Sequence, residues 1–90
     1  MEEVKGKVRE FVLDAAQRKG LNSITDDEPL TENGVVDSLT IFRMVSFLED
    51  AFGIRITDDE IVNENFQSVN TIESFVAGKL SKKASAVQQR

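Results

Sequence analysis

Residues 2–19 carry apolar side chains at every third or fourth position, the spacing of the buried face of an α-helix. Acidic residues stand at the start of this stretch, and Arg18 and Lys19 stand at its end, which is the order that the helix dipole favours. Gly20 follows, and glycine commonly ends a helix because it adopts the left-handed conformation without strain. The pattern predicts a first helix over residues 2–19.

A second helix is predicted over residues 38–52, with Asp37 as its N-cap and Gly53 as its stop. The side chains that share its apolar face are Ile41, Val45, Leu48 and Phe52. The nearly opposite face holds one large apolar residue and three polar ones: Leu39, Arg43, Ser46 and Asp50. We expect the first face to lie in the core and the second to meet solvent.

Capping signals indicate two further helices. Residues 57–60 form a capping box that opens a short helix through Ile61 and Val62. Residues 70–73 offer a second capping signal, for a final helix that reaches Leu80.

Residues 20–36 form a long connection between the first two helices, and apolar residues are spaced through it. Irregular connections of this length are uncommon in compact domains, so we expect this one to pack over the core. The predicted fold class is all-α, a four-helix bundle with a short third helix and a long first loop. One domain is expected over residues 1–80, and residues 81–90 are expected to form a disordered C-terminal tail.

The 90 residues include neither cysteine nor histidine. The chain therefore lacks thiolate ligands, thiol nucleophiles and the usual general base near neutral pH, and we expect no catalytic residues and no enzyme activity. The acidic residues around Gly34 lack the spacing of a calcium-binding loop, and no metal site is predicted. No apolar run is long enough to span a membrane and the amino end lacks a basic secretory start, which predicts a cytoplasmic location.

The formal net charge is −5, and residues 20–75 hold twelve acidic residues against two basic ones. Such a surface would repel the phosphates of nucleic acid, so no nucleic-acid partner is expected. The acidic residues could meet basic patches on protein partners, or could serve only to keep a small domain, expected to be a monomer, in solution.

Ser38 lies in the first turn of the second predicted helix, beside Asp37 and after a turn that contains Gly34. A phosphate ester on this hydroxyl would lie next to the unpaired N–H groups at the positive end of the helix dipole. Serine and aspartate are also common at helix starts because their oxygens cap N–H groups. By itself the Asp-Ser-Leu triplet therefore allows either a modified serine or an ordinary helix cap.

In its context this segment resembles the acyl carrier protein family, and the resemblance covers residues 2–80. The triplet is followed by a mostly apolar helix and then by Leu-Glu-Asp-Ala-Phe-Gly-Ile-Arg-Ile at residues 48–56. Members of the family carry 4′-phosphopantetheine, supplied by coenzyme A, on the serine of this motif. The resemblance implies a four-helix bundle of acyl-carrier type in which Ser38 is the attachment residue and Asp37 helps the transferase to act.

The resemblance also implies which residues meet partners and cargo. The partner-facing positions would be Leu39, Phe42, Arg43, Ser46, Glu49 and Asp50. The candidate lining of an acyl cavity would be Ile41, Val45, Leu48, Phe52, Ile61 and Val62. Each residue of the second set also suits plain core packing.

One departure from the family pattern concerns the helix that partners recognise. Carriers of fatty acid synthesis usually have acidic residues right after the Ser-Leu pair and near the middle of that helix, where this sequence has Thr40 and Arg43. A positive charge there opposes docking on a basic partner patch. We therefore expect a specialised stand-alone carrier of a lipid-modification, polyketide-like or aminoacyl pathway.

The predicted function is to hold an acyl intermediate as a thioester on the arm at Ser38 and to deliver it to enzymes of lipid or specialised metabolite biosynthesis. The expected partners are a phosphopantetheinyl transferase, a loading ligase and a downstream synthase or transferase. An alternative within the same family is a stand-alone aminoacyl or peptidyl carrier. An alternative of another class is an unmodified helical adaptor that docks through Leu39, Phe42 and Phe47.

Overall fold

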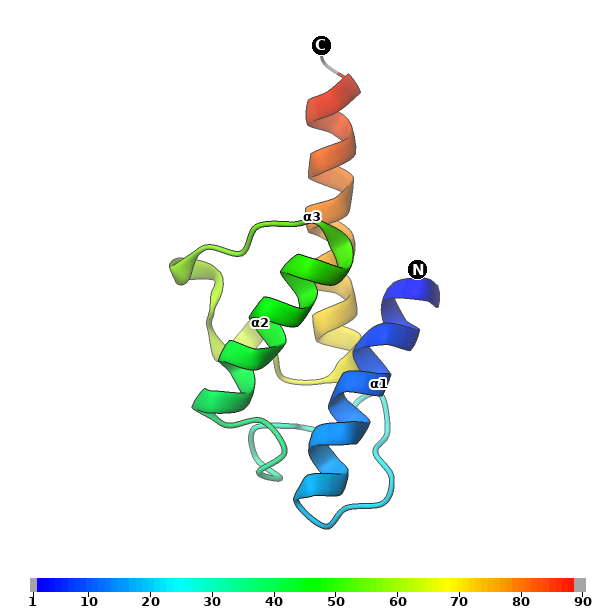
Figure 1. Ribbon diagram of the computed structural model, residues 1–90, viewed down its shortest axis with the longest axis vertical. Coiled ribbons are helices and arrows are strands. Elements are labelled where there is room, and N and C mark those ends of the chain that lie inside the picture. The colour runs from blue at the N-terminus through cyan, green and yellow to red at the C-terminus, as the bar shows by residue number, and fades with distance from the viewer. Residues whose placement is uncertain (1, 89–90) are drawn as a thin grey trace.

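The computed structural model describes residues 2–88, with the side chains of residues 3–82. Its elements are the helices α1 (Glu2–Arg18), α2 (Ser38–Phe52) and α3 (Val69–Gln88) and the 3₁₀ turns η1 (Asp58–Glu60) and η2 (Asn63–Asn65) (Figure 1). No strand forms within the described range. The all-helical prediction is therefore confirmed, and α2 has the predicted bounds.

The apolar faces of the helices meet in one core. In Figure 1, α1 and α2 face the viewer, while α3 passes behind them and packs against α1. The buried face of α1 consists of residues four apart, each at most 1% exposed: Val4, Val8, Val12 and Ala16. This spacing is the one from which the helix was predicted.

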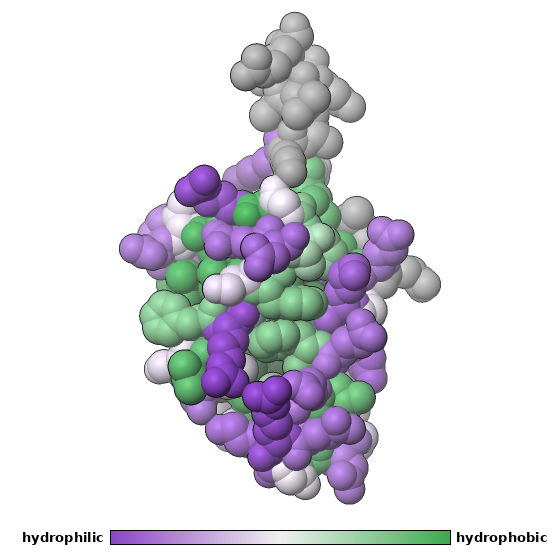
Figure 2. Space-filling model, viewed as in Figure 1, coloured by the Kyte–Doolittle hydropathy of each residue, from purple (hydrophilic) through white to green (hydrophobic). Residues whose placement is uncertain are grey.

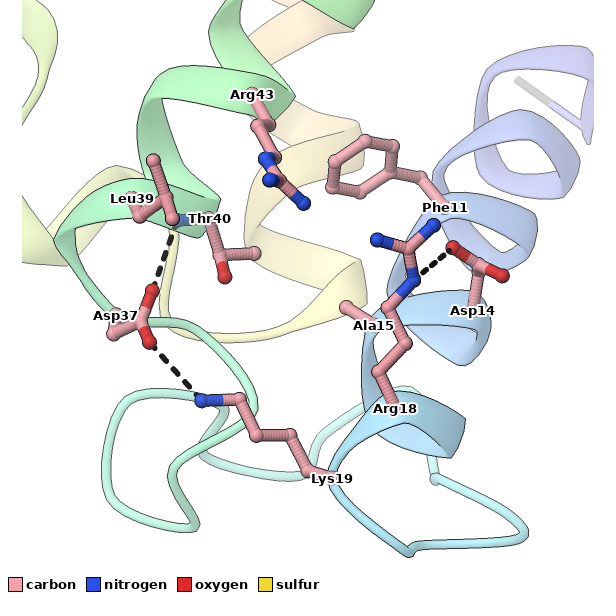
Figure 3. Close-up of a pocket in the computed structure, with 9 residues that line it drawn as sticks. All are labelled: Phe11, Asp14, Ala15, Arg18, Lys19, Asp37, Leu39, Thr40 and Arg43. Atoms are coloured by element: carbon pink, nitrogen blue, oxygen red, sulfur yellow. Dashed lines mark hydrogen bonds and ion pairs between the residues drawn. The ribbon is translucent and has the colours of Figure 1, made fainter.

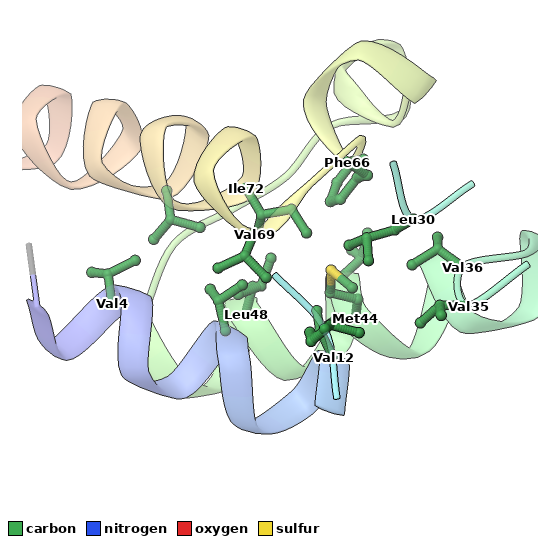
Figure 4. Close-up of a cluster of buried hydrophobic side chains, with 14 of the residues drawn as sticks. Val4, Val12, Leu30, Val35, Val36, Met44, Leu48, Phe66, Val69 and Ile72 are labelled. Carbon is green, nitrogen blue, oxygen red and sulfur yellow. The ribbon is translucent and has the colours of Figure 1, made fainter. Parts of the chain in front are cut away.

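The long connection between α1 and α2 packs onto this core, as predicted. Four of its apolar residues are buried: Ile24, Leu30, Val35 and Val36. The N–H of Leu30 donates to the carbonyl of Gln67 at 2.7 Å, and the N–H of Val36 donates to the carbonyl of Leu30 at 2.9 Å. Figure 4 shows Leu30 opposite Phe66, which is also fully buried. The connection is thus a packed part of the domain.

Asp26 ties the same connection to both α1 and α3. Its carboxylate forms ion pairs with Arg9 and with Lys5, whose Nζ lies 3.3 Å from Oδ2. Its carbonyl accepts the N–H of Asn70 at 3.0 Å. The Arg9 guanidinium, with a smaller contribution from Lys5, lowers the pKa of Asp26 below its ordinary value.

The turns η1 and η2 stand where a short third helix was predicted. The capping box itself is present, because the N–H of Thr57 donates to Oε1 of Glu60 at 3.0 Å. The helix does not continue, since Val62 has an extended backbone with φ −125° and ψ 154°, and the Asn65 side chain donates to the Glu60 carbonyl at 2.8 Å. β-Branched residues such as Ile61 and Val62 disfavour helix. The described chain has three α-helices, so the predicted count of four is not confirmed.

The start of α3 also differs from the prediction. The residue that caps it is Ser68, whose Oγ accepts the N–H of Thr71 at 3.1 Å. The predicted cap, Asn70, instead lies inside the helix, and its side chain donates to the carboxylate of Asp27 in the long connection. A capping-type residue is thus used for a contact between distant segments.

α3 continues to Gln88, whereas the sequence predicted helix only to Leu80 and a disordered tail from Ser81. The added residues, 81–88, include two Lys, two Ala and one Gln, which are good helix formers. Residues 89–90 of the predicted tail lie outside the described residues. No helix within residues 2–88 has both the length and the apolar character needed to cross a bilayer.

The packing of the long connection predicts a large loss of stability for Leu30→Ala. Leu30 is 0% exposed, so the substitution should lower the free energy of unfolding by about 2–5 kcal/mol, measured by urea denaturation. The matched control is Leu39→Ala, because Leu39 is 62% exposed and its loss should change stability by about 0.5 kcal/mol or less. Equal losses in the free energy of unfolding for the two variants would contradict the burial of Leu30 in the core.

The ion pair between Glu60 and Lys79 predicts a pH-dependent contribution to stability. The Lys79 ammonium, together with the Thr57 N–H, lowers the pKa of Glu60 from 4.5 to about 2. A lowered carboxyl pKa stabilises the fold above the ordinary value, and this stabilisation is lost as the pH falls from about 4.5 towards 2. The melting temperature of Glu60→Gln should therefore lie below that of the unaltered protein near neutral pH. The difference between the two melting temperatures should narrow as the pH falls from about 4.5 towards 2. Lys79→Gln should lower the melting temperature with the same dependence on pH. A difference in melting temperature that does not change with pH would contradict the role given to the ion pair.

Candidate functional site

Ser38 is the first residue of α2 and its side chain is exposed. The helix starts there because Asp37, in extended conformation, caps it: Oδ1 of Asp37 accepts the N–H of Thr40 at 2.9 Å. Within the described residues, the N–H groups of Ser38 and Leu39 make no hydrogen bond. An exposed hydroxyl thus lies beside free backbone donors at the positive end of the α2 dipole.

Lys19 brings a positive charge from the end of α1 to this helix start. Its Nζ lies 3.0 Å from Oδ2 of Asp37 (Figure 3). The N–H of Thr40 and then the Lys19 ammonium hold the pKa of Asp37 well below its ordinary value of 3.8. From the sequence, Lys19 was expected only to be a favourable charge at a helix end, because no local pattern shows a contact between residues 18 positions apart.

The turn before Ser38 is held from inside the molecule. Gly34 has φ 82°, which is the left-handed region that glycine adopts without strain. The N–H of Val35 then donates to Oδ1 of Asn33 at 3.0 Å, and the side chains of Val35 and Val36 are buried. The chain therefore reaches Asp37 and Ser38 from two anchored residues.

A groove of about 230 Å³ lies between α1 and the first turns of α2 (Figure 3). Its lining comprises Phe11, Asp14, Ala15, Arg18, Lys19, Asp37, Leu39, Thr40 and Arg43. Asp37 and Leu39 flank Ser38 in the sequence, so the groove begins at the attachment position implied by the resemblance. This groove was not predicted from the sequence, because four of its nine lining residues come from α1 and the others lie at residue 19 or beyond.

Most of the predicted partner-facing residues are exposed on α2. Leu39 and Phe42 are 62% and 63% exposed, and three polar residues beside or beyond them are also exposed: Arg43, Ser46 and Asp50. In Figure 2 hydrophobic side chains gather over the part of this face where α2 lies, with hydrophilic ones around them. Glu49 differs, because it is half-buried and its Oε2 accepts the N–H of Ile56 at 2.9 Å.

Phe47 lies on another side of α2 and is partly buried. Its ring packs on that of Phe11 in α1, with 5.1 Å between the ring centroids. Of the three residues on which the adaptor alternative relies, only Leu39 and Phe42 are therefore free to meet a partner.

The predicted cavity residues take different positions in the core. Val45 and Leu48 are buried, while three others are partly buried and pack against the core: Ile41, Phe52 and Ile61. Val62 is 39% exposed and does not join them. The structure thus brings five of the six residues together as packed core, and their role in holding an acyl chain stays a prediction.

Comparisons with known proteins agree with the site. Residues 7–77 match the family model described as "Phosphopantetheine attachment site". The chain is 35% identical over 78 residues to an acyl carrier protein of Buchnera aphidicola, covering 84% of this chain and 94% of that one. It is 34% identical over 67 residues to a D-alanyl carrier protein of Streptococcus uberis, and the match covers 72% of this chain and 85% of that one. An acyl carrier protein homolog of Mycoplasmopsis pulmonis is 34% identical over 72 residues, covering 80% and 94%.

The exposed serine at a capped helix start suits a covalently bound phosphate ester, and the family model spans most of the chain. The chain therefore belongs to the family of carrier proteins that bear covalently attached 4′-phosphopantetheine.

Proposed function

We propose that this protein carries an acyl group as a thioester on 4′-phosphopantetheine attached to Ser38, and delivers it to enzymes of lipid or specialised metabolite biosynthesis. The observation that carries the proposal is the exposed position of Ser38 at the first residue of α2, directly after the capping Asp37. The prosthetic group supplies the thiol that this cysteine-free chain lacks. We propose no catalytic role for the chain itself.

The residues around Ser38 prepare it for this attachment. Oγ of Ser38 forms the new ester bond to the phosphorus of coenzyme A that bears pantetheine, the bond from that phosphorus to the nucleotide breaks, and adenosine 3′,5′-bisphosphate leaves. Asp37 fixes the first turn of α2 through Thr40, so that the hydroxyl stays outside the cap. The free N–H groups at the helix start favour the negative phosphodiester that results.

Partner enzymes would dock on the exposed side of α2. Leu39 and Phe42 offer apolar contact there, and Arg43, Ser46 and Asp50 surround them with polar groups. We propose as partners a phosphopantetheinyl transferase, a loading ligase and a downstream synthase or transferase. We also propose that the carrier works as a monomer in the cytoplasm.

Carriage of an aminoacyl group is the second candidate function. The similarity to a D-alanyl carrier protein favours it, because that name describes an aminoacyl cargo on a related chain. An unmodified adaptor has less support, since Phe47 packs on Phe11 and is not available for docking.

Attachment of the arm predicts a gain in mass that depends on one hydroxyl. Incubation of the protein with coenzyme A and a broad-specificity phosphopantetheinyl transferase should add one phosphopantetheine, measured by intact mass spectrometry. Ser38→Ala should add none. The control is Ser81→Ala, which removes an exposed hydroxyl of α3, outside the proposed docking side of α2, and should be modified like the unaltered protein. The proposal would be contradicted if folded Ser38→Ala gained the phosphopantetheine, or if the unaltered protein gained none.

The charge of Arg43 predicts poor use by enzymes of fatty acid synthesis. A ketoacyl synthase whose docking patch is basic should show a kcat/KM for Arg43→Glu about tenfold above that for the unaltered carrier, since the variant replaces a like charge with an opposite one. Arg55→Glu makes the same change of net charge at an exposed position outside α2 and should have a smaller effect. Efficient use of the unaltered carrier would overturn this reading of Arg43.

A further inference from the structure

The groove between α1 and α2 combines an apolar lining with charged groups. Phe11, Ala15 and Leu39 supply the apolar surface, and Thr40 adds a polar group from the first turn of α2 (Figure 3). Ser38 does not line the groove, but its sequence neighbours Asp37 and Leu39 do, so a group on a flexible tether at Ser38 can reach it. It is therefore open to a small molecule held by the protein's own arm.

The charges of the groove do not cancel. Asp14 pairs with Arg18, whose Nε lies 3.2 Å from Oδ2, and Asp37 pairs with Lys19 at 3.0 Å. Arg43 is exposed and forms no ion pair with any described residue, and its guanidinium points across the groove towards Phe11 in Figure 3. One cation is thus left without a countercharge beside an apolar surface.

We propose that this groove receives the acyl end of the arm and that Arg43 selects a cargo ending in a carboxylate. The inference rests on the proposed attachment at Ser38 and names the class of cargo. A guanidinium binds a carboxylate through two parallel hydrogen bonds, whereas it repels the ammonium of an aminoacyl group. The unpaired charge therefore favours the acyl function over the aminoacyl one.

The distance between the two residues suits a tethered ligand. Arg43 follows Ser38 by five residues, which corresponds to a rise of about 7.5 Å along an α-helix and a rotation of about 140° around its axis, so a flexible arm has to pass around the Leu39 side of α2 to reach Arg43. A short flexible tether keeps its end at an effective concentration of about millimolar, so a weak contact is enough to populate the groove. The apolar carbons of the cargo would lie against Phe11 and Leu39.

The test uses three cargoes of similar size and different charge. A phosphopantetheinyl transferase loads the protein with hydrolysis-resistant coenzyme A analogues bearing succinyl, butyryl or β-alanyl groups, and intact mass confirms each loading. Backbone NMR shifts then report on Ala15, Thr40 and Arg43, and ¹³C NMR gives the pKa of the succinyl carboxylate. We expect succinyl to shift these groove signals more than butyryl or β-alanyl does. Its pKa should fall by about half a unit relative to the free analogue, the size expected of an exposed ion pair.

Two variants assign the effect. Arg43→Gln keeps a helix-forming side chain and should abolish both the extra shifts and the lowered pKa, whereas Arg55→Gln removes an exposed arginine elsewhere and should leave both unchanged. Equal shifts for succinyl and butyryl would overturn the inference while leaving the attachment intact. So would a succinyl carboxyl pKa that stays as low in Arg43→Gln as in the unaltered protein. A chain that takes up no arm at Ser38 would overturn the proposed function, and this inference with it.

Discussion

The burial of Leu30, Val35 and Val36 in the helical core is the constraint on which the position of Ser38 depends. A connection of this length loses much conformational entropy when it is ordered, so its apolar anchors must supply the compensating free energy. Two of these anchors stand immediately before Asp37 and Ser38. Because they are held from inside, the hydroxyl that follows is presented outside, at the start of a capped helix.

The contact between α1 and α2 gives the same site its electrostatic character. The chain as a whole has a net charge of −5, yet Lys19 and Arg18 at the end of α1 and Arg43 on α2 line one groove beside Ser38. Two of these three charges are neutralised by Asp37 and Asp14. An acidic protein thus carries a small cationic surface where its arm is proposed to be attached, which separates this carrier from one whose recognition helix is acidic throughout.

Local signals in the sequence were sufficient to predict α2 and the residues that begin and end it. Asp37 caps the helix, and Gly53 ends it with φ 63° and its N–H donating to the carbonyl of Glu49 at 2.9 Å. Each of these contacts joins residues three or four positions apart, so the sequence pattern contains them. The spacing of the apolar residues in the long connection likewise predicted that it packs on the core.

Contacts between distant segments account for what the sequence did not predict. Asn70 resembles a helix cap, but it binds Asp26 and Asp27, more than 40 positions earlier, and Ser68 caps α3 instead. The groove beside Ser38 arises in the same way, since its two walls come from α1 and α2. The short helix predicted after residue 57 does not form, and the reason is local: Val62 adopts the extended backbone that β-branched residues favour.

The most direct test of the account is a peptide map, by tandem mass spectrometry, of the protein isolated from the cells that make it. The account predicts phosphopantetheine on the peptide that contains Ser38, on the Oγ of that residue. A folded and functional protein that carries no such group, or carries it on another residue, would contradict the account.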